Sequence, residues 1–216
     1  MDINYIMSKK KKIQELMRDP ENWVEPGNEY DVKHLCLSNR QLEHSVLKDT
    51  DLSGADFQHS NLTGSDFSGS KLASADFYNV MMDESTLVKV DLQRANLAGS
   101  DLSQSDFSGS NLRRANLQTT DIWDSNLSNV DLTNANLLGT DLHGSNLVGA
   151  NLDFAGWPLS CGSFDVIVDK RIAAQLAYHF CRLVCDDEEV IAAQEALKKL
   201  ANTSHLITEH KCDKIS

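Results

Sequence analysis

The chain has 216 residues, of which 32 are acidic and 20 are Lys or Arg, and its formal net charge is −12. This excess of acid argues against direct binding to nucleic acid or to an anionic membrane, because both need a basic protein surface. No run of 18 apolar residues is present, so the sequence predicts no transmembrane helix. The five scattered cysteines favour reduced thiols and a cytoplasmic location.

Residues 1–34 are predicted to form an N-terminal segment of their own. The stretch SKKKKIQELMRDP predicts a short helix that ends at Pro20 and places Ile13, Leu16 and Met17 on one side. Packed over the start of the next segment, this helix would cover an open β edge. Its four lysines are expected to be a solvated charge run, with contact to nucleic acid as the alternative.

Residues 35–156 are dominated by a repeat of five residues. From Thr50 to Phe154 the chain consists of 21 consecutive units without an insertion, and the central residue is Leu in fifteen and Phe in four of them. The residue two positions earlier is always Ala, Ser, Thr or Val, and the residue between is Asp or Asn in 18 units. The same phase extends back through Leu47, Leu42 and Leu37, which gives 24 units.

The period of the repeat predicts the path of the chain. A small and a large apolar side chain two positions apart point to the same side of an extended backbone. Because five is an odd number, the chain must bend once in every unit to keep these side chains on one core. Gly at the last position of eight units suits a bend that needs unusual backbone dihedrals. Such regular self-similarity predicts a solenoid.

The stretches ADFQHSNLTGSDFSG and ANLLGTDLHGSNLVGANL resemble the A(D/N)LXX repeats of the pentapeptide repeat family. The resemblance implies an all-β solenoid, a right-handed quadrilateral β-helix with four units per coil, so that residues 35–156 would form about six coils. The predicted core holds no polar group large enough for chemistry, and no nucleophile–base pair or phosphate loop is found elsewhere. We therefore expect a protein that is not an enzyme and has no cofactor.

Four units per coil would place residues 20 apart on the same outward face. Counted from Leu52, the third face would carry six acids and no base, whereas the first would carry Arg94, Arg113 and Arg114. The predicted contacts of a protein partner on this third face are Asp83, Glu84, Asp101, Asp121, Trp123, Asp124 and Asp141.

Not every acid of the repeat is expected to take part in binding. Asp and Asn interchange between the small and the large apolar residue, as expected if their side chains cap the bend by accepting nearby backbone N–H groups. Asp106 is an acid of this kind. Asp83, Glu84 and Asp124 lie off that position, and a stack of Asp101, Asp121 and Asp141 at about 4.8 Å would cost repulsion.

The resemblance implies two further functions. Some members of the family resemble duplex DNA and protect DNA gyrase from quinolones, so a DNA mimic that binds gyrase, a topoisomerase or another DNA-binding enzyme is one alternative. Residues 50–154 hold fourteen acids against five bases, about half the charge density of DNA, which permits this function without demanding it. A dimeric structural scaffold is the other alternative.

Residues 157–216 are predicted to form a helical cap after the repeat ends. The stretch DKRIAAQLAYHFCRLVC predicts a helix with Asp169 as its N-cap, and DDEEVIAAQEALKKLAN predicts a second helix of about fourteen residues. The tail is similar to those of uncharacterised pentapeptide proteins from Gram-positive bacteria and their phages. Because family towers often join end to end through such helices, the resemblance implies a homodimer with contacts at Ile172, Leu176, Phe180 and Leu183.

The same tail contains residue types that can bind zinc, namely Cys161, His179, Cys181 and Cys185. Their spacing differs from the paired C-x-x-C of structural zinc sites. Cys181 and Cys185 are one helical turn apart, which suits two thiols packed in a core. We therefore predict no metal, with a zinc-dependent activity as the alternative.

Overall fold

A computed structural model describes residues 35–156, 166–181 and 188–202. The predicted N-terminal helix lies outside these residues, as do Cys161, Leu183 and Cys185. Within the described helices, the side chains of His179 and Phe180 are not placed.

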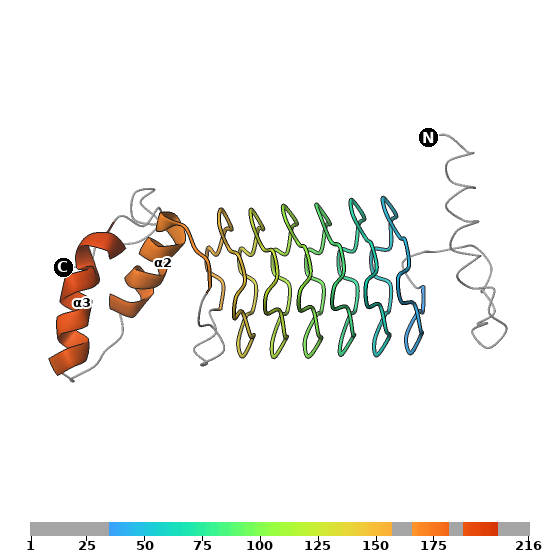
Figure 1. Cartoon of the computed structure of the whole chain (residues 1–216), viewed down its shortest axis with the longest axis horizontal. Coiled ribbons are helices and arrows are strands. Elements are labelled where there is room, and N and C mark those ends of the chain that lie inside the picture. The colour runs from blue at the N-terminus through green and yellow to red at the C-terminus, as the bar shows by residue number, and fades with distance from the viewer. Residues whose placement is uncertain (1–34, 157–165, 182–187, 203–216) are drawn as a thin grey trace.

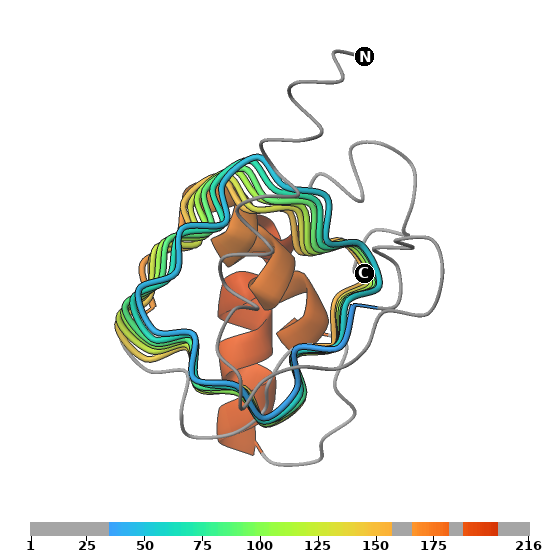
Figure 2. The same ribbon diagram turned by 90° about the vertical axis from the view of Figure 1, so that its right-hand side faces the viewer.

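Residues 35–156 wind into a tower of stacked coils, and α2 (Lys170–Cys181) and α3 (Glu188–Ala201) lie at its C-terminal end (Figure 1). Parallel bridges join residues 20 positions apart, from Cys36 with Asp56 to Asn136 with Gly156. Viewed along the tower, the coils superpose in one outline with four corners (Figure 2). Each coil therefore holds four five-residue units, and the extended segments are so short that each unit contributes a single bridge.

The bend in each unit is made by a residue with left-handed backbone geometry. The last residue of every unit from Asn39 to Phe154 has a φ between 50° and 76°. Eight of these residues are Gly, and sixteen are other residues, often Asn or Asp. A side chain makes this region costly for most residues, so the stacked coils must stabilise it. The backbone supplies that support, because the Asn79 N–H donates to the Ala98 carbonyl at 3.0 Å and the Arg94 N–H donates to the Arg113 carbonyl at 3.0 Å.

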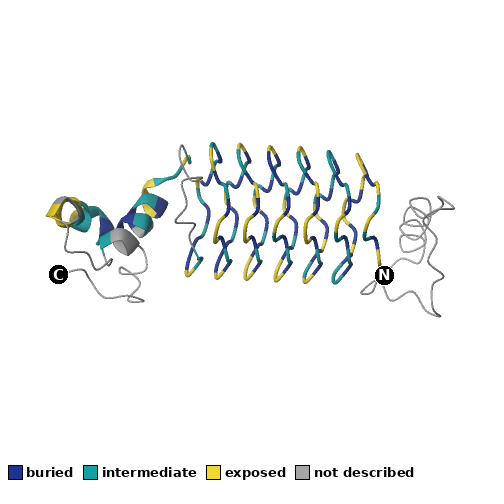
Figure 3. Ribbon diagram, turned by 90° about the horizontal axis from the view of Figure 1, so that it is seen from below, coloured by how far each residue is buried: buried dark blue, intermediate teal, exposed yellow. Residues whose placement is uncertain are grey.

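The core is a continuous stack of the central residues. From Leu52 to Leu147 each of them is at most 1% exposed. Phe57 stacks on Phe77 with 4.8 Å between ring centroids, and Phe67 meets both rings edge-on. Buried and exposed residues alternate around every coil, as Figure 3 shows. The period of five thus places apolar side chains inside and polar side chains outside on every face.

Buried serines line the corner that follows the third face. They recur every 20 residues from Ser45 to Ser145. The Ser105 Oγ donates to the Met82 carbonyl at 2.9 Å and accepts the Ser85 N–H at 3.0 Å. Such a hydroxyl satisfies two buried backbone groups of the preceding coil, which explains why a small polar residue suits this position.

Asp169 joins the tower to α2. Ile167 bridges Asn146 and is the last of the described residues to form a backbone bridge with the tower. The next backbone donor, the Gly149 N–H, is accepted by the Asp169 Oδ2 at 2.9 Å, and the Asp169 Oδ1 accepts the Ile172 N–H at 3.0 Å. The N-cap prediction for Asp169 is confirmed, and one carboxylate serves both the last coil and the helix.

α2 packs on the tower, and α3 packs on α2. Ile172 is fully buried against the tower core and Leu176 packs on the same core. Ala177 of α2 and Ala201 of α3 are buried between the two helices. The prediction that Ile172 contacts a second copy is therefore corrected, because its side chain is already covered within the chain. Among the described residues, no helix is long and apolar enough to cross a membrane.

Candidate protein-binding face

The register of the coils brings the predicted acids together on one face. Asp101 bridges Met81 and Asp121, and Asp121 bridges Asp141, so these residues form one column along the tower. Asp83 and Glu84 belong to the Met81 unit, and Trp123 and Asp124 to the Asp121 unit. Gln41 bridges Asn61 at the start of the same column, so the unit of Gln41 adds Glu43 to this face. The predicted set lacked Glu43 because it began at Thr50, although the repeat phase through Leu42 indicates this unit. The acidic face is hereafter Glu43, Asp83, Glu84, Asp101, Asp121, Trp123, Asp124 and Asp141.

Apart from the unit of Glu43, the described units of this face contain no Lys or Arg to balance its carboxylates. Within its described units between Asn61 and Gly144 there is no Lys or Arg, and the first base, Arg40, stands in the unit of Glu43. Six of the acids lie within four coils, which span about 19 Å and give roughly one charge per 3 Å. One strand of B-DNA carries one phosphate per about 3.4 Å. The acidic face thus approaches the charge spacing of a nucleic-acid backbone.

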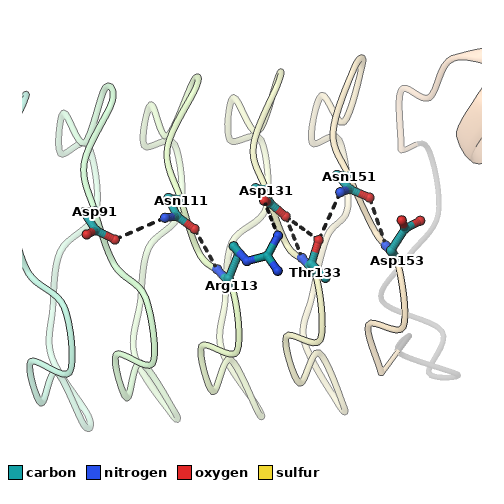
Figure 4. A network of polar contacts seen from close by, with 7 residues as sticks. All are labelled: Asp91, Asn111, Arg113, Asp131, Thr133, Asn151 and Asp153. Atoms are coloured by element: carbon teal, nitrogen blue, oxygen red, sulfur yellow. Dashed lines mark hydrogen bonds and ion pairs between the residues drawn. The ribbon is translucent and has the colours of Figure 1, made fainter.

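Some acids on the other faces pair with a cation. Arg113 lies 3.0 Å from Asp131 on the first face, in the network that Figure 4 shows, and Lys48 lies 2.6 Å from Asp66 on the fourth. Burial opposes the ionisation of Asp131 and Asp66, yet hydrogen bonds from neighbouring hydroxyl and N–H groups and from these cations hold the pKa of both below its usual range. Asp101, Asp121 and Asp141 lack such a partner among the described residues.

Most repeat-position acids serve the bend, as predicted. Of the 18 Asp and Asn residues at this position between Thr50 and Phe154, 17 accept the backbone N–H two residues later. Asp106 is one of them, with a distance of 2.8 Å to the Ser108 nitrogen. Asp121 is the exception, and its exposed carboxylate makes no hydrogen bond or ion pair with any described residue. Bend geometry therefore does not explain Asp121.

The column around Asp121 also lacks the amide ladders of the other faces. On the second face the Asn116 Nδ2 donates to the Asn96 Oδ1 at 3.1 Å, and the Asn96 Nδ2 donates to the Asp76 Oδ1 at 3.0 Å. A column of three carboxylates has no donor for such a ladder. Partial desolvation and the charges of Asp101 and Asp141 raise the pKa of Asp121. Asn would suit the fold better at this site, so folding does not account for the acid.

We expect Asp121→Asn to stabilise the fold by about 0.5 kcal/mol at neutral pH, because the amide removes like-charge repulsion and supplies a donor to Asp101. The raised pKa of Asp121 means that the native state binds its proton more tightly than the unfolded state. The advantage of the variant should therefore be absent below about pH 4, the unfolded pKa of Asp, and grow as the pH rises through the raised native value. Urea unfolding of both proteins at pH 3.5 and 7 measures this. An equal midpoint at pH 7 would contradict it.

The remaining acids of the face lie at the corner and beside it. Glu84 and Asp124 are exposed at left-handed positions with φ of 56° and 53°. A Cβ built on Gly144 would lie 1.9 Å from the Asp124 Oδ1, so the glycine leaves room for this carboxylate in the next coil. Asp83 is half-buried and accepts the Thr63 hydroxyl at 2.7 Å.

The described part of the tail contains no group of three or more His, Cys, Asp or Glu residues that could hold a metal ion. Cys181 is half-buried between the helices, where its thiol donates to the Gln194 carbonyl at 3.3 Å and burial raises its pKa. The other three candidate zinc ligands fall outside the described residues or have side chains that are not placed.

Comparison with known proteins identifies the repeat. The family described as pentapeptide repeats matches in eight copies over residues 50–87, 85–124 and 125–155. The chain belongs to the pentapeptide repeat family. Proteins of this family fold as right-handed quadrilateral β-helices and are generally structural or interaction proteins without enzymatic activity. The 20-residue register and the four-cornered outline of the tower agree with that fold.

Several solved pentapeptide repeat proteins are similar to this chain. One from Nostoc is 30% identical over 48% of this chain and 84% of its own, with a TM-score of 0.43. One from the thylakoid lumen of Arabidopsis thaliana is 29% identical over 64% of this chain and 79% of its own, with a TM-score of 0.34. QnrB1, a plasmid-mediated fluoroquinolone resistance protein, is 16% identical over 65% of this chain and 96% of its own, with a TM-score of 0.35. No curated protein matches the sequence.

Proposed function

We propose that this pentapeptide repeat protein is a non-enzymatic docking protein whose acidic face binds a basic surface of a protein partner. The observation that carries the proposal is the exposed carboxylate of Asp121. It lies in one column between the carboxylates of Asp101 and Asp141, and it makes no hydrogen bond with the described part of the fold. Such an arrangement costs stability in the free protein. A cationic partner would relieve the repulsion on binding, so the cost is recovered only in the complex.

The tower holds the backbone that carries these carboxylates in a fixed position. Two residues that follow Asp121 are tied to the next coil, because the Ile122 N–H donates to the Asp141 carbonyl at 2.9 Å and the Asp124 N–H donates to the His143 carbonyl at 2.7 Å. Ile122 is itself buried in the core. Since the backbone is already ordered, binding costs little conformational entropy. The face therefore suits recognition of a partner whose cations are also regularly spaced.

A DNA mimic is the specific form of this proposal. The spacing of roughly one carboxylate per 3 Å on the acidic face resembles one strand of a duplex. A gyrase, a topoisomerase or another DNA-binding enzyme would then bind the face through the basic surface that it uses for DNA. The proposal of a cytoplasmic location fits such a partner.

The test changes Asp101, Asp121, Asp124 and Asp141 together to Asn. The tower already contains Asn at both kinds of position, as in Asn96 and Asn129, so we expect the variant to fold. If each lost charge contact is worth about 1 kcal/mol, the affinity for the partner falls at least 100-fold. The first measurement is inhibition of DNA supercoiling by DNA gyrase. In the second, DNA-binding proteins are selected that the immobilised wild type, but not the immobilised variant, retains from host extract. Calorimetry then gives their affinity for both proteins.

A matched control separates the face from the net charge. Asp51, Asp56, Asp76 and Asp91 changed to Asn remove the same number of charges from the first and second faces. This control should keep wild-type affinity at moderate salt. Equal losses in both variants would show that total charge, and not the acidic face, governs binding, and the proposal would be wrong.

The predicted homodimer remains a separate proposal, under which the protein is a dimeric scaffold. With Ile172 buried against the tower, the exposed large apolar residue that the described part of the two helices offers for such contact is Ile191 of α3, which is 41% exposed. Sedimentation of the wild type and of Ile191→Glu tests this proposal without touching the acidic face. A scaffold would lose its dimer in the variant, whereas a protein that is monomeric in both cases would exclude it.

A further inference from the structure

Met81 departs from the repeat in the middle of the acidic face. Asp or Asn occupies its position in 18 of the 21 units from Thr50 to Phe154, and the three other residues are Lys71, Met81 and Thr86. Lys71 lies 3.9 Å from Asp51 and so has an ionic partner. Met81 cannot accept the N–H of the bend, and it is 49% exposed. The fold therefore gains nothing from Met81 that Asn would not provide.

The surroundings of Met81 distinguish it from other exposed apolar residues. Its column neighbour one coil on is Asp101, and its own unit continues with Asp83 and Glu84. Leu138 is equally exposed at 50%, but it lies on the second face in a unit without charge. Methionine is enriched in protein interfaces, where an apolar centre is typically surrounded by polar residues. A purely electrostatic contact would not need this side chain.

Trp123 gives the face a second apolar group. It is half-buried and stands in the Asp121 unit, two coils beyond Met81. Two coils span about 10 Å along the tower, and Trp123 stands two residues further around the coil than Asp121 of the Met81 column, a sideways offset of at most about 7 Å. Residues i and i+7 of an α-helix are separated by about 10.5 Å along its axis and lie on the same side. Asp101 and Asp121 both lie in the column of Met81, beside the line from Met81 to Trp123.

We propose that the acidic face binds a basic amphipathic α-helix that crosses it obliquely, from Met81 to Trp123. Apolar residues at i and i+7 of this helix contact Met81 and Trp123, and Lys or Arg residues between and beside them pair with Asp101 and Asp121. This inference rests on the proposed function, because it names the chemistry of the partner at the same face. Charge complementarity brings the helix to the face, and the two apolar contacts set its register.

Two synthetic helical peptides test the proposal. The first has Leu at i and i+7 with Lys around them, and the second has Gln in place of both Leu, so their charges are equal. The wild type should bind the Leu peptide about tenfold more tightly than the Gln peptide in fluorescence anisotropy titrations. Met81→Asn restores the residue type of the repeat, so it should fold, and it should reduce that ratio by more than half.

The controls keep each outcome decisive. Leu138→Gln removes an equally exposed apolar group from the second face and should leave the ratio unchanged. An unchanged ratio in Met81→Asn, or an equal loss in Leu138→Gln, would overturn the helix proposal. The Asn variant of Asp101, Asp121, Asp124 and Asp141 should weaken both peptides alike. If that variant bound both peptides as the wild type does, the acidic face itself, and hence the proposed function, would fail instead.

Discussion

Replacing Leu97 by Asp is expected to unfold the coils on either side of it. Leu97 is 0% exposed, and its column neighbours Phe77 and Leu117 are equally buried. The new carboxylate would have no partner in the stack of central residues, and such burial costs at least about 4 kcal/mol. Because each coil of a solenoid is stabilised mainly by its neighbours, the damage should spread beyond one coil.

Thermal unfolding followed by circular dichroism, with hydrogen exchange of the amides around Leu97, measures this effect. Leu97→Met is the matched control, because it keeps the apolar volume and should cost less than about 1.5 kcal/mol. Slow exchange at the Leu97 and Leu117 amides in the Asp variant, as in the wild type, would contradict the expected result.

The second large effect is expected at the junction of tower and helix. Asp169→Ala leaves the Gly149 N–H and the Ile172 N–H without their acceptor. The lost N-cap and the unpaired tower amide together should cost about 2–3 kcal/mol. We expect α2 and the last coil to unfold before the rest of the tower, which hydrogen exchange at the Gly149 amide would detect.

The contribution of Asp169 should depend on pH. Burial opposes its ionisation, but the N–H groups of Ile172, Gly149 and Arg171 and the charge of Arg171 hold its pKa below the usual range. The stabilisation is therefore complete above about pH 4, the unfolded pKa of Asp, and is lost as the pH falls through the lower native value. Asp169→Asn should retain part of the cap without this acid loss. If the difference in free energy of unfolding between the wild type and Asp169→Asn did not change from pH 7 to pH 2, this account would be wrong.

Residues with the same place in the repeat can have different roles, and the sequence could not separate them. Asp106 and Asp121 both stand between a small and a large apolar residue. Only the structure shows that Asp106 caps its bend and that Asp121 does not. The third-face grouping likewise depended on four units per coil, a number that came from the family resemblance because a local pattern does not define the angle of each corner.

The tail shows the same limit. Helical spacing predicted that Ile172 and Leu176 share one side of a helix, and the structure has them on one side. The pattern could not say whether a second copy or the tower covers that side. In the structure the tower covers that side. Asp169 accepts the Gly149 N–H of the last coil and thereby directs α2 onto this coil.

The sequence by itself therefore determined the bend in every unit, the apolar stack and the family, because a five-residue period leaves few ways to bury a Leu at every fifth position. Only the tertiary structure decided which acidic side chains form hydrogen bonds that stabilise the fold. Whether a carboxylate is satisfied depends on the donors that lie one coil away, 20 residues distant in the chain, and no local pattern contains that information.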